Sequence, residues 1–156
     1  MIFGKRSEQI YAPATGTIMS LQDVKDDVFS TEMMGPGLAI DIDSPELIIY
    51  APIASTVEAL YPTGHAIGLK TKNGTDVLLH VGLDSFKKKG LIKKHVSKGD
   101  RVRRGQLLVE INQTVADPTD LIVLLTFPAL TKSLTPLYKD NDLVQARKQP
   151  IFKIVP

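Results

Sequence analysis

The feature that most restricts the fold of this chain is a succession of short segments in which apolar and polar residues alternate. These segments are separated by Gly, Pro, Asn and Asp, and they include 11–21, 37–42, 47–53, 55–61 and 101–111. Strands with one buried face have this two-residue period, and frequent turn residues between them are typical of antiparallel folds. We therefore predict an all-β fold, a compact antiparallel β-sandwich or barrel. Helical signal is thin: an acidic start favours a short helix at residues 140–146, and the polar segment 23–31 is expected to be irregular, with at most a helical turn.

Composition excludes several classes of protein. The 156 residues are 43% hydrophobic and 23% charged, as expected for one globular domain. The chain has no cysteine, which excludes disulfides and thiolate metal sites and fits a reducing cytoplasm. It has no apolar run of the ~20 residues that a membrane helix needs, and no secretory signal. With a net charge of +2 and 6% aromatic residues, it does not resemble a nucleic-acid-binding protein. We expect a free-standing, cytoplasmic monomer.

The strongest local signal is the dipeptide Asn73-Gly74, which lies between two extended runs. Asn-Gly is the dipeptide most typical of a tight β-hairpin turn. A two-residue loop there places His80 opposite Ile67 and His65 opposite Gly82, and a four-residue loop gives the same register.

This register predicts that both histidines lie on one face of the hairpin. Residues two apart share a face, so His65 and His80 become diagonal neighbours about 7–8 Å apart at the backbone. Gly82, opposite His65, would leave open space beside the rings. The other face is apolar and is expected to pack in the core (Val77, Leu79, Val81 and Leu83).

Two neighbouring imidazoles suggest phosphoryl transfer. A neutral imidazole is a nucleophile near neutral pH, and its phosphoramidate is labile enough to pass the group on. The second imidazole can donate a hydrogen bond to the phosphoryl oxygens, Thr63 can fix the tautomer of His65, and backbone amides near Gly82 can help to hold the group. The alternative is that a half-buried strand carries two incidental histidines. His95 lies in a polar run and is given no role.

The motifs around these histidines resemble the glucose-type enzyme IIA domain of the bacterial phosphoenolpyruvate-dependent sugar phosphotransferase system. The resemblance covers residues 11–111 best, and we expect one such domain of type 1 over 1–156. Its most specific parts are Thr63-x-His65-Ala66 and Leu78-x-His80-x-Gly82-x-Asp84. Weaker matches are Ala12-Pro13-x-x-Gly16, Val28-Phe29, Met34-Gly35-x-Gly37-Leu38-Ala39-Ile40, Tyr50-Ala51-Pro52 and Gly99-Asp100-x-Val102-x-x-Gly105-Gln106-x-Leu108.

The resemblance implies an antiparallel barrel-sandwich hybrid, of the duplicated hybrid motif kind, with a shallow apolar depression around the histidines. It implies a phosphotransferase component without cofactor or metal. His80 would accept a phosphoryl group from the phosphocarrier protein HPr, as a tele-phosphohistidine, and pass it to a cysteine of an enzyme IIB domain. His65 would stabilise the phosphorylated state, Thr63 would orient His65, and Gly82 and Asp84 would lie beside the phosphate. The resemblance further implies a partner-docking rim made of Asp26, Val28, Phe29, Tyr61, Ile67 and Phe86.

Other functions stay open at this point. A regulatory protein of the same fold would signal through its phosphorylation state and use the same surface. A zinc hydrolase would need a third protein ligand and a general base, and no H-x-H or H-E-x-x-H occurs. A lipoyl or biotinyl carrier is suggested by the glycines of 99–108, but Met33-Met34 has no modifiable lysine beside it. The transported sugar and the permease are not readable from these residues.

Overall fold

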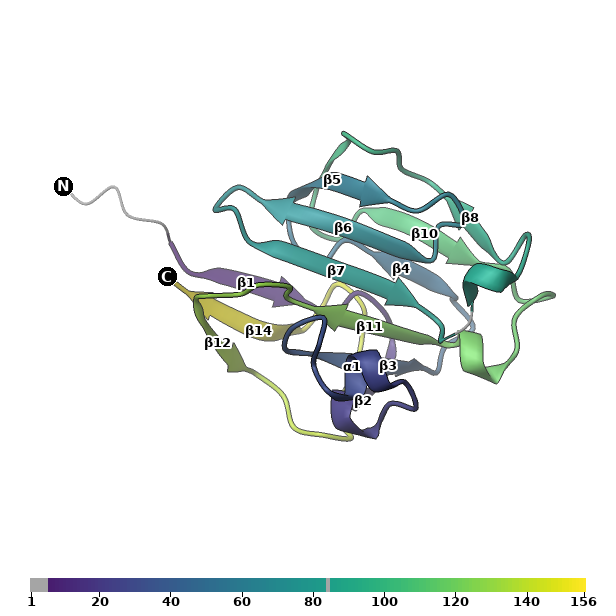
Figure 1. Ribbon diagram of the computed structural model, residues 1–156, viewed down its shortest axis with the longest axis horizontal. Coiled ribbons are helices and arrows are strands. Elements are labelled where there is room, and N and C mark those ends of the chain that lie inside the picture. The colour runs from purple at the N-terminus through teal and green to yellow at the C-terminus, as the bar shows by residue number, and fades with distance from the viewer. Residues whose placement is uncertain (1–5, 84) are drawn as a thin grey trace.

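The computed structural model describes residues 6–83 and 85–156, without the side chains of Asp27, Val28 and Phe86. Nearly all regular structure in these ranges is antiparallel strand (Figure 1). The strands are β1 (Glu8–Tyr11), β2 (Gly16–Met19), β3 (Gly37–Ile42), β4 (Ile48–Tyr50), β5 (Ser55–Leu60), β6 (Ala66–Thr71), β7 (Asp76–Val81), β8 (Ile92–Lys94), β9 (Arg101–Val102), β10 (Leu107–Ile111), β11 (Ile122–Thr126), β12 (Ser133–Pro136), β13 (Leu143–Val144) and β14 (Pro150–Val155). The helical elements are short: η1 (Leu21–Asp23), α1 (Asp27–Ser30), η2 (Ser85–Lys87) and η3 (Pro118–Asp120). The predicted all-β class is confirmed.

The strands form one large sheet and two small ones. The large sheet has the order β13-β2-β3-β11-β7-β6-β5-β9, and the small sheets are β4-β10-β8 and β1-β14-β12. Figure 1 shows β6, β7 and β11 across the front of the molecule, with β4 and β10 behind them. The main core lies between the layers and is lined by the inward-facing residues of all three sheets.

The large sheet has a second covered area on its outer face. Every residue of β11 is buried, because alternate residues face two different clusters. Val123 and Leu125 belong to the main core. Ile122 and Leu124 pack instead with Phe29 and other residues of the 21–34 segment, which folds over this part of the sheet. His80, described below, contacts Phe29 at the margin of this outer cluster.

The register of the β6–β7 hairpin differs from the prediction by one residue. Ala66 lies opposite His80, and Ile67 lies opposite Leu79. The reason is the turn: it has three residues rather than two or four, and the amide of Gly74 donates to the carbonyl oxygen of Thr71 over 2.9 Å. A one-residue slip moves a side chain to the other face of its strand.

The prediction of a helix at residues 140–146 is also wrong. Residues Leu143–Val144 form β13, which pairs with β2 at the edge of the large sheet. Asp142 uses its carboxylate to accept the backbone amide of Lys139 over 2.8 Å, which closes a turn before the strand. Sheet pairing outweighs the weak local helix preference here. Within the described ranges, no helix has both the length and the apolar character that crossing a membrane requires.

Candidate functional site

His80 lies on the outer face of the large sheet, at the edge of the 21–34 cover. Its neighbours along β7 alternate with it and belong to the core. Across the sheet, Leu124 of β11 lies on one side of His80 and Ala66 of β6 on the other. The Phe29 ring contacts the imidazole, with ring centroids 5.0 Å apart. His80 is therefore a half-buried side chain on a rigid central strand.

The contact at Nδ1 of His80 determines which ring nitrogen carries the proton. Nδ1 lies 2.9 Å from the carbonyl oxygen of Gly82. A carbonyl oxygen only accepts hydrogen bonds, so Nδ1 is the donor. In the neutral ring the lone pair then resides on Nε2, and Nε2 is the nucleophilic atom.

Gly82 supplies this carbonyl from a sharp turn directly after β7. Its φ is +72°, and its amide donates to the carbonyl oxygen of Ile122 over 2.8 Å. A Cβ at this position would lie 1.7 Å from Oγ of Ser85 and 3.3 Å from Cα of Asp120. We predicted that glycine at this position leaves space beside the histidine rings, and this prediction is wrong. The absence of a side chain at Gly82 instead makes room for Ser85 and Asp120.

Gly82→Ala is expected to be strongly destabilising, and Gly90→Ala provides a matched control. Both glycines have positive φ, but a Cβ at Gly90 meets nothing within 4 Å. Gly90→Ala should lower the free energy of unfolding by about 1–2 kcal/mol through backbone strain alone. Gly82→Ala should cost about 1–3 kcal/mol more, because its Cβ overlaps Ser85. Urea denaturation of both variants measures the difference, and equal losses would contradict this account.

His65 lies one residue before β6. The alternation of side chains along that strand therefore does not determine which face the His65 side chain occupies. Its carbonyl oxygen accepts the amide of Val81 over 2.7 Å. Its ring centroid lies 5.2 Å from that of His80, with the rings at 84° to each other. Thr63 and Nδ1 of His65 share a short hydrogen bond. The two imidazoles thus meet as predicted, although the predicted register was wrong.

Burial lowers the basicity of both rings. The pKa of His65 is lowered from its ordinary 6.5 by burial. The pKa of His80 is also lowered, first by burial and then by the neighbouring His65, and the Gly82 carbonyl and Asp26 only partly oppose this. Burial and the neighbouring His65 thus favour the neutral, nucleophilic form of His80 at neutral pH.

This shift predicts how His80 titrates. Because its pKa is lowered, the ring should be mostly neutral at pH 6.5, where an unperturbed imidazole is half protonated, and become half protonated only under more acidic conditions. The lone pair on Nε2 is then retained across the physiological range. NMR titration of the imidazole carbon-bound protons is the measurement. A midpoint for His80 at or above the 6.5 of an unperturbed histidine would contradict the prediction.

A zinc centre would need more than this pair. Among residues 6–83 and 85–156, no three side chains of His, Cys, Asp or Glu are placed to hold one metal ion together.

Comparison with known proteins identifies the family. The family model described as "phosphoenolpyruvate-dependent sugar phosphotransferase system, EIIA 1" matches residues 8–127. The chain belongs to this EIIA family. The predicted resemblance is thereby confirmed, and the match extends beyond the 11–111 region in which the motifs are clearest.

Individual relatives agree with this assignment. A "PTS system glucose-specific EIIA component" of Halalkalibacterium halodurans is 40% identical over 108 residues, which are 69% of this chain and 61% of that protein. One of Staphylococcus aureus is 42% identical over 117 residues, 71% of this chain and 69% of that protein. The matched part thus spans less than two thirds of the Halalkalibacterium protein. A solved structure, glucose permease IIA from Mycoplasma capricolum, superimposes with a TM-score of 0.83 and 29% identity over 98% of this chain and 99% of that one.

The EIIA structure brings some of the predicted rim residues to the histidines. Phe29 packs on His80, and Tyr61 contacts the edge of His65 with ring centroids 5.2 Å apart. Tyr61 is 53% exposed, whereas Phe29 is only 5% exposed. Phe29 thus forms the floor of the site, and Tyr61 forms an accessible wall. Asp26 is near enough to act on the pKa of His80.

One predicted rim residue is wrong, and two others, together with the phosphate-adjacent Asp84, lie outside the described parts. Ile67 is fully buried in the main core, because the one-residue change of register turns it away from His80. It cannot contact a partner. Asp84 as a whole, and the side chains of Val28 and Phe86, lie outside the described residues.

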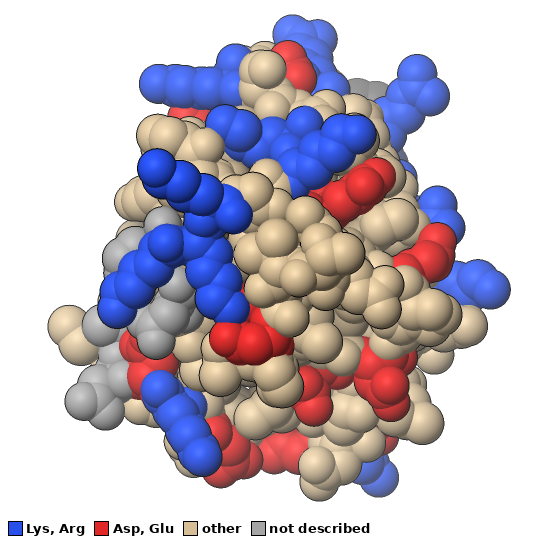
Figure 2. All heavy atoms as spheres, turned by 90° about the vertical axis from the view of Figure 1, so that its right-hand side faces the viewer, with Lys and Arg blue, Asp and Glu red and all other residues tan. Residues whose placement is uncertain are grey.

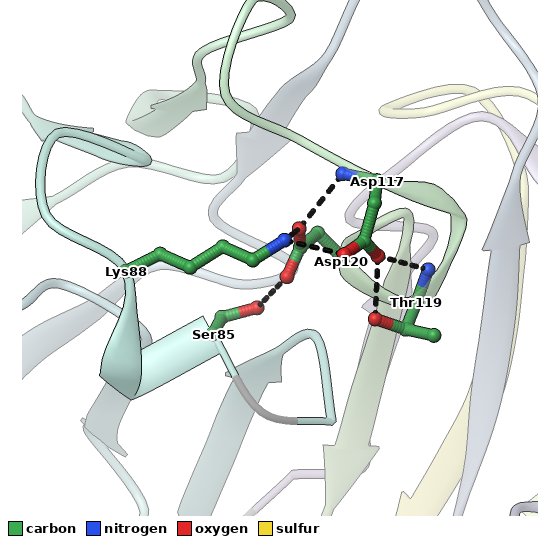
Figure 3. Close-up of polar contacts among 5 residues, drawn as sticks. All are labelled: Ser85, Lys88, Asp117, Thr119 and Asp120. Atoms are coloured by element: carbon green, nitrogen blue, oxygen red, sulfur yellow. Dashed lines mark hydrogen bonds and ion pairs between the residues drawn. The ribbon is translucent and has the colours of Figure 1, made fainter.

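The sequence analysis missed a polar cluster behind the Gly82 turn (Figure 3). Asp120 accepts hydrogen bonds from Ser85 and Lys88, and Lys88 also binds Asp117. A local signal for part of it was present. Asp117-Pro118-Thr119-Asp120 is a capping box with proline at the first helical position, and the structure forms it as the cap of η3.

Proposed function

We propose that this chain is a phosphocarrier of the sugar phosphotransferase system, in which Nε2 of His80 accepts a phosphoryl group from phospho-HPr and yields it to a cysteine of an enzyme IIB domain. The observation that carries the proposal is the hydrogen bond from Nδ1 of His80 to the Gly82 carbonyl. It leaves the lone pair of the neutral ring on Nε2. We include residues 1–156 in one EIIA domain, which is supported by the solved relative that covers 98% of the chain.

The transfer requires no proton movement at the attacking atom. The lone pair of Nε2 forms a bond to phosphorus while the bond between phosphorus and the donor breaks. Positive charge then develops on the His80 ring, and the Nδ1–H bond to the Gly82 carbonyl stabilises it. In the second step a cysteine thiolate attacks phosphorus, the N–P bond breaks, and neutral His80 is restored.

His65 would act on the phosphoryl oxygens. When the Thr63 hydroxyl donates to Nδ1 of His65, the proton of the neutral ring is placed on Nε2. With the ring centroids 5.2 Å apart, this N–H can donate to a phosphoryl oxygen held on His80. The donor is positioned before the reaction, so it stabilises the developing charge without reorganisation.

The surrounding surface is suited to protein partners rather than to a small substrate. Figure 2 shows the end of the molecule where β8, η2 and η3 lie, with Lys and Arg gathered over one part and Asp and Glu over another. Lys87 of η2 and Lys93 and Lys94 of β8 are exposed, as is Lys89 shortly after η2. Areas of opposite charge on one face can orient two different partners in turn.

The proposal is tested by incubating the protein with phosphoenolpyruvate, enzyme I and HPr and measuring its intact mass. We expect the mass to increase by one phosphoryl group, and the product to be labile in acid, as a phosphoramidate is. An unchanged mass, under conditions that phosphorylate a glucose-specific EIIA protein, would reject the proposal.

A further inference from the structure

The carbonyl that holds His80 is not fixed by its own strand. Gly82 follows the last residue of β7 and starts the loop that leads into η2. Two backbone bonds tie this loop to the start of β11 and to η3: Gly82 donates to Ile122 over 2.8 Å, and Leu83 donates to Thr119 over 3.3 Å. The orientation of the Gly82 carbonyl therefore depends on how η3 and the loop are held against each other.

Asp120 makes the side-chain connection between these two segments. Its side chain has no exposed surface. One carboxylate oxygen accepts the Ser85 hydroxyl over 2.8 Å, and the other accepts the Lys88 ammonium and, over 2.9 Å, the amide of Asp117. Figure 3 shows the carboxylate between Ser85 and Lys88 on one side and Asp117 on the other. A buried carboxylate with this many donors is strongly held in place.

The ammonium of Lys88 offsets part of the negative charge of the two carboxylates in the cluster. Burial alone would raise the pKa of Asp120, but the bonds from Lys88, Asp117 and Ser85 lower it overall. The bond from Lys88 is also the first cause that lowers the pKa of Asp117, to about 2. Asp120 is thus ionised at neutral pH, and neutralising it would weaken the bonds from Ser85 and Lys88, while Lys88 would still bind Asp117.

Ser85 transmits this connection to Gly82. Its hydroxyl occupies the space directly above Cα of Gly82, since a Cβ built there would lie 1.7 Å from Oγ. The carbonyl of Ser85 accepts the amide of Lys88 over 3.1 Å, which holds the same turn from its other end. The hydroxyl that Asp120 holds is therefore packed against the residue whose carbonyl binds His80.

We infer that Asp120 is a positioning residue: through Ser85 and Lys88 it holds the Gly82 carbonyl at Nδ1 of His80 and so keeps the nucleophilic lone pair on Nε2. The consequence for phosphoryl transfer rests on the proposed function, whereas the effect on the His80 tautomer does not. No local pattern in residues 76–84 contains this information, because the residue responsible lies in another segment of the chain.

The test is Asp120→Asn, a change of nearly equal volume that removes the charge and one acceptor. Nitrogen-15 NMR of the histidine side chains distinguishes a protonated Nδ1 from an unprotonated one. In the unmodified protein His80 should show a protonated Nδ1, and in Asp120→Asn a mixture of the two tautomers. The rate of phosphoryl acceptance from phospho-HPr should fall about tenfold, the loss equivalent to one hydrogen bond. Asp100→Asn, which alters an exposed carboxylate that closes a turn onto Ser97, should change neither quantity.

Further variants separate positioning from a loss of folding. Ser85→Ala removes one donor and no charge, and it should shift the His80 spectrum in the same direction by a smaller amount. Lys88→Arg keeps the cation and should restore most of the tautomer that Lys88→Met loses. If Asp120→Asn does not fold, Ser85→Ala and the Lys88 pair decide the question alone. Folded variants that retain the unmodified His80 spectrum would overturn the inference.

The two proposals fail in different ways. If HPr does not phosphorylate the unmodified protein while Asp120→Asn still changes the His80 tautomer, the positioning role stands and the phosphocarrier function falls. If the unmodified protein is phosphorylated and the folded variants match it in both tautomer and rate, the phosphocarrier function stands and the positioning role is wrong.

Discussion

Replacing His80 with alanine or glutamine is expected to abolish phosphoryl acceptance from phospho-HPr. Both variants remove the one atom of this chain that forms a bond to phosphorus in the proposed mechanism, so the loss should be complete rather than partial. Glutamine keeps a polar side chain of similar reach, and it separates the loss of the nucleophile from the loss of packing against Phe29. The measurement is the intact mass after incubation with phosphoenolpyruvate, enzyme I and HPr.

His95→Gln is the matched control for this experiment. His95 lies after β8, and its Nε2 is 3.2 Å from a carboxylate oxygen of Glu110, with both side chains partly exposed. The same chemical change there should leave phosphorylation unaltered. If the His80 variants still gained a phosphoryl group and the His95 variant did not, the assignment of the acceptor would be wrong.

His65→Ala is expected to accept the phosphoryl group and to fail in passing it on. The nucleophile and its Nδ1 partner are both intact in this variant, so acceptance on His80 should persist. The hydrogen-bond donor aimed at the phosphoryl oxygens is lost, and removing one such preorganised donor slows a transfer by about 10²–10³-fold. Onward transfer to an enzyme IIB domain should therefore fall by about this factor.

The experiment uses His65→Ala that has first been phosphorylated and separated from HPr. Loss of the phosphoryl group is followed by intact mass after the IIB domain is added, and unmodified phosphoprotein is measured in parallel. Transfer at the unmodified rate would show that His65 has no role in the second step. Failure at the first step would place its role in acceptance instead.

The accuracy of the predictions made from the sequence differs from one element to the next. The alternation Val77, Leu79 and Val81 predicted the core face of β7, and the structure buries all three, whereas Leu83, predicted on the same face, packs against the outer cluster. The Asn73-Gly74 dipeptide predicted a hairpin at the observed place. It did not predict the register, because loops of two and three residues have similar sequences and only the backbone angles and packing select between them. That single residue moved Ile67 from the predicted rim to the core.

The sequence by itself determined the fold class, the family and the two histidines of the candidate site. These depend on signals that are local in the chain: a two-residue period, turn residues at regular spacing, and motifs a few residues long. The structure confirms these predictions because an alternating segment can form a strand with one buried face whichever register it adopts.

The tertiary structure alone decided which face each hairpin residue occupies, which nitrogen of His80 bears the proton, and what holds the Gly82 carbonyl. Each depends on a distance between atoms that the local pattern does not specify. The contact between Ser85 and Asp120 joins residues 35 positions apart, and it forms only because β7 and β11 are neighbours in the large sheet. Packing of distant segments, rather than local preference, thus determines the chemistry of the imidazole that the sequence had already indicated.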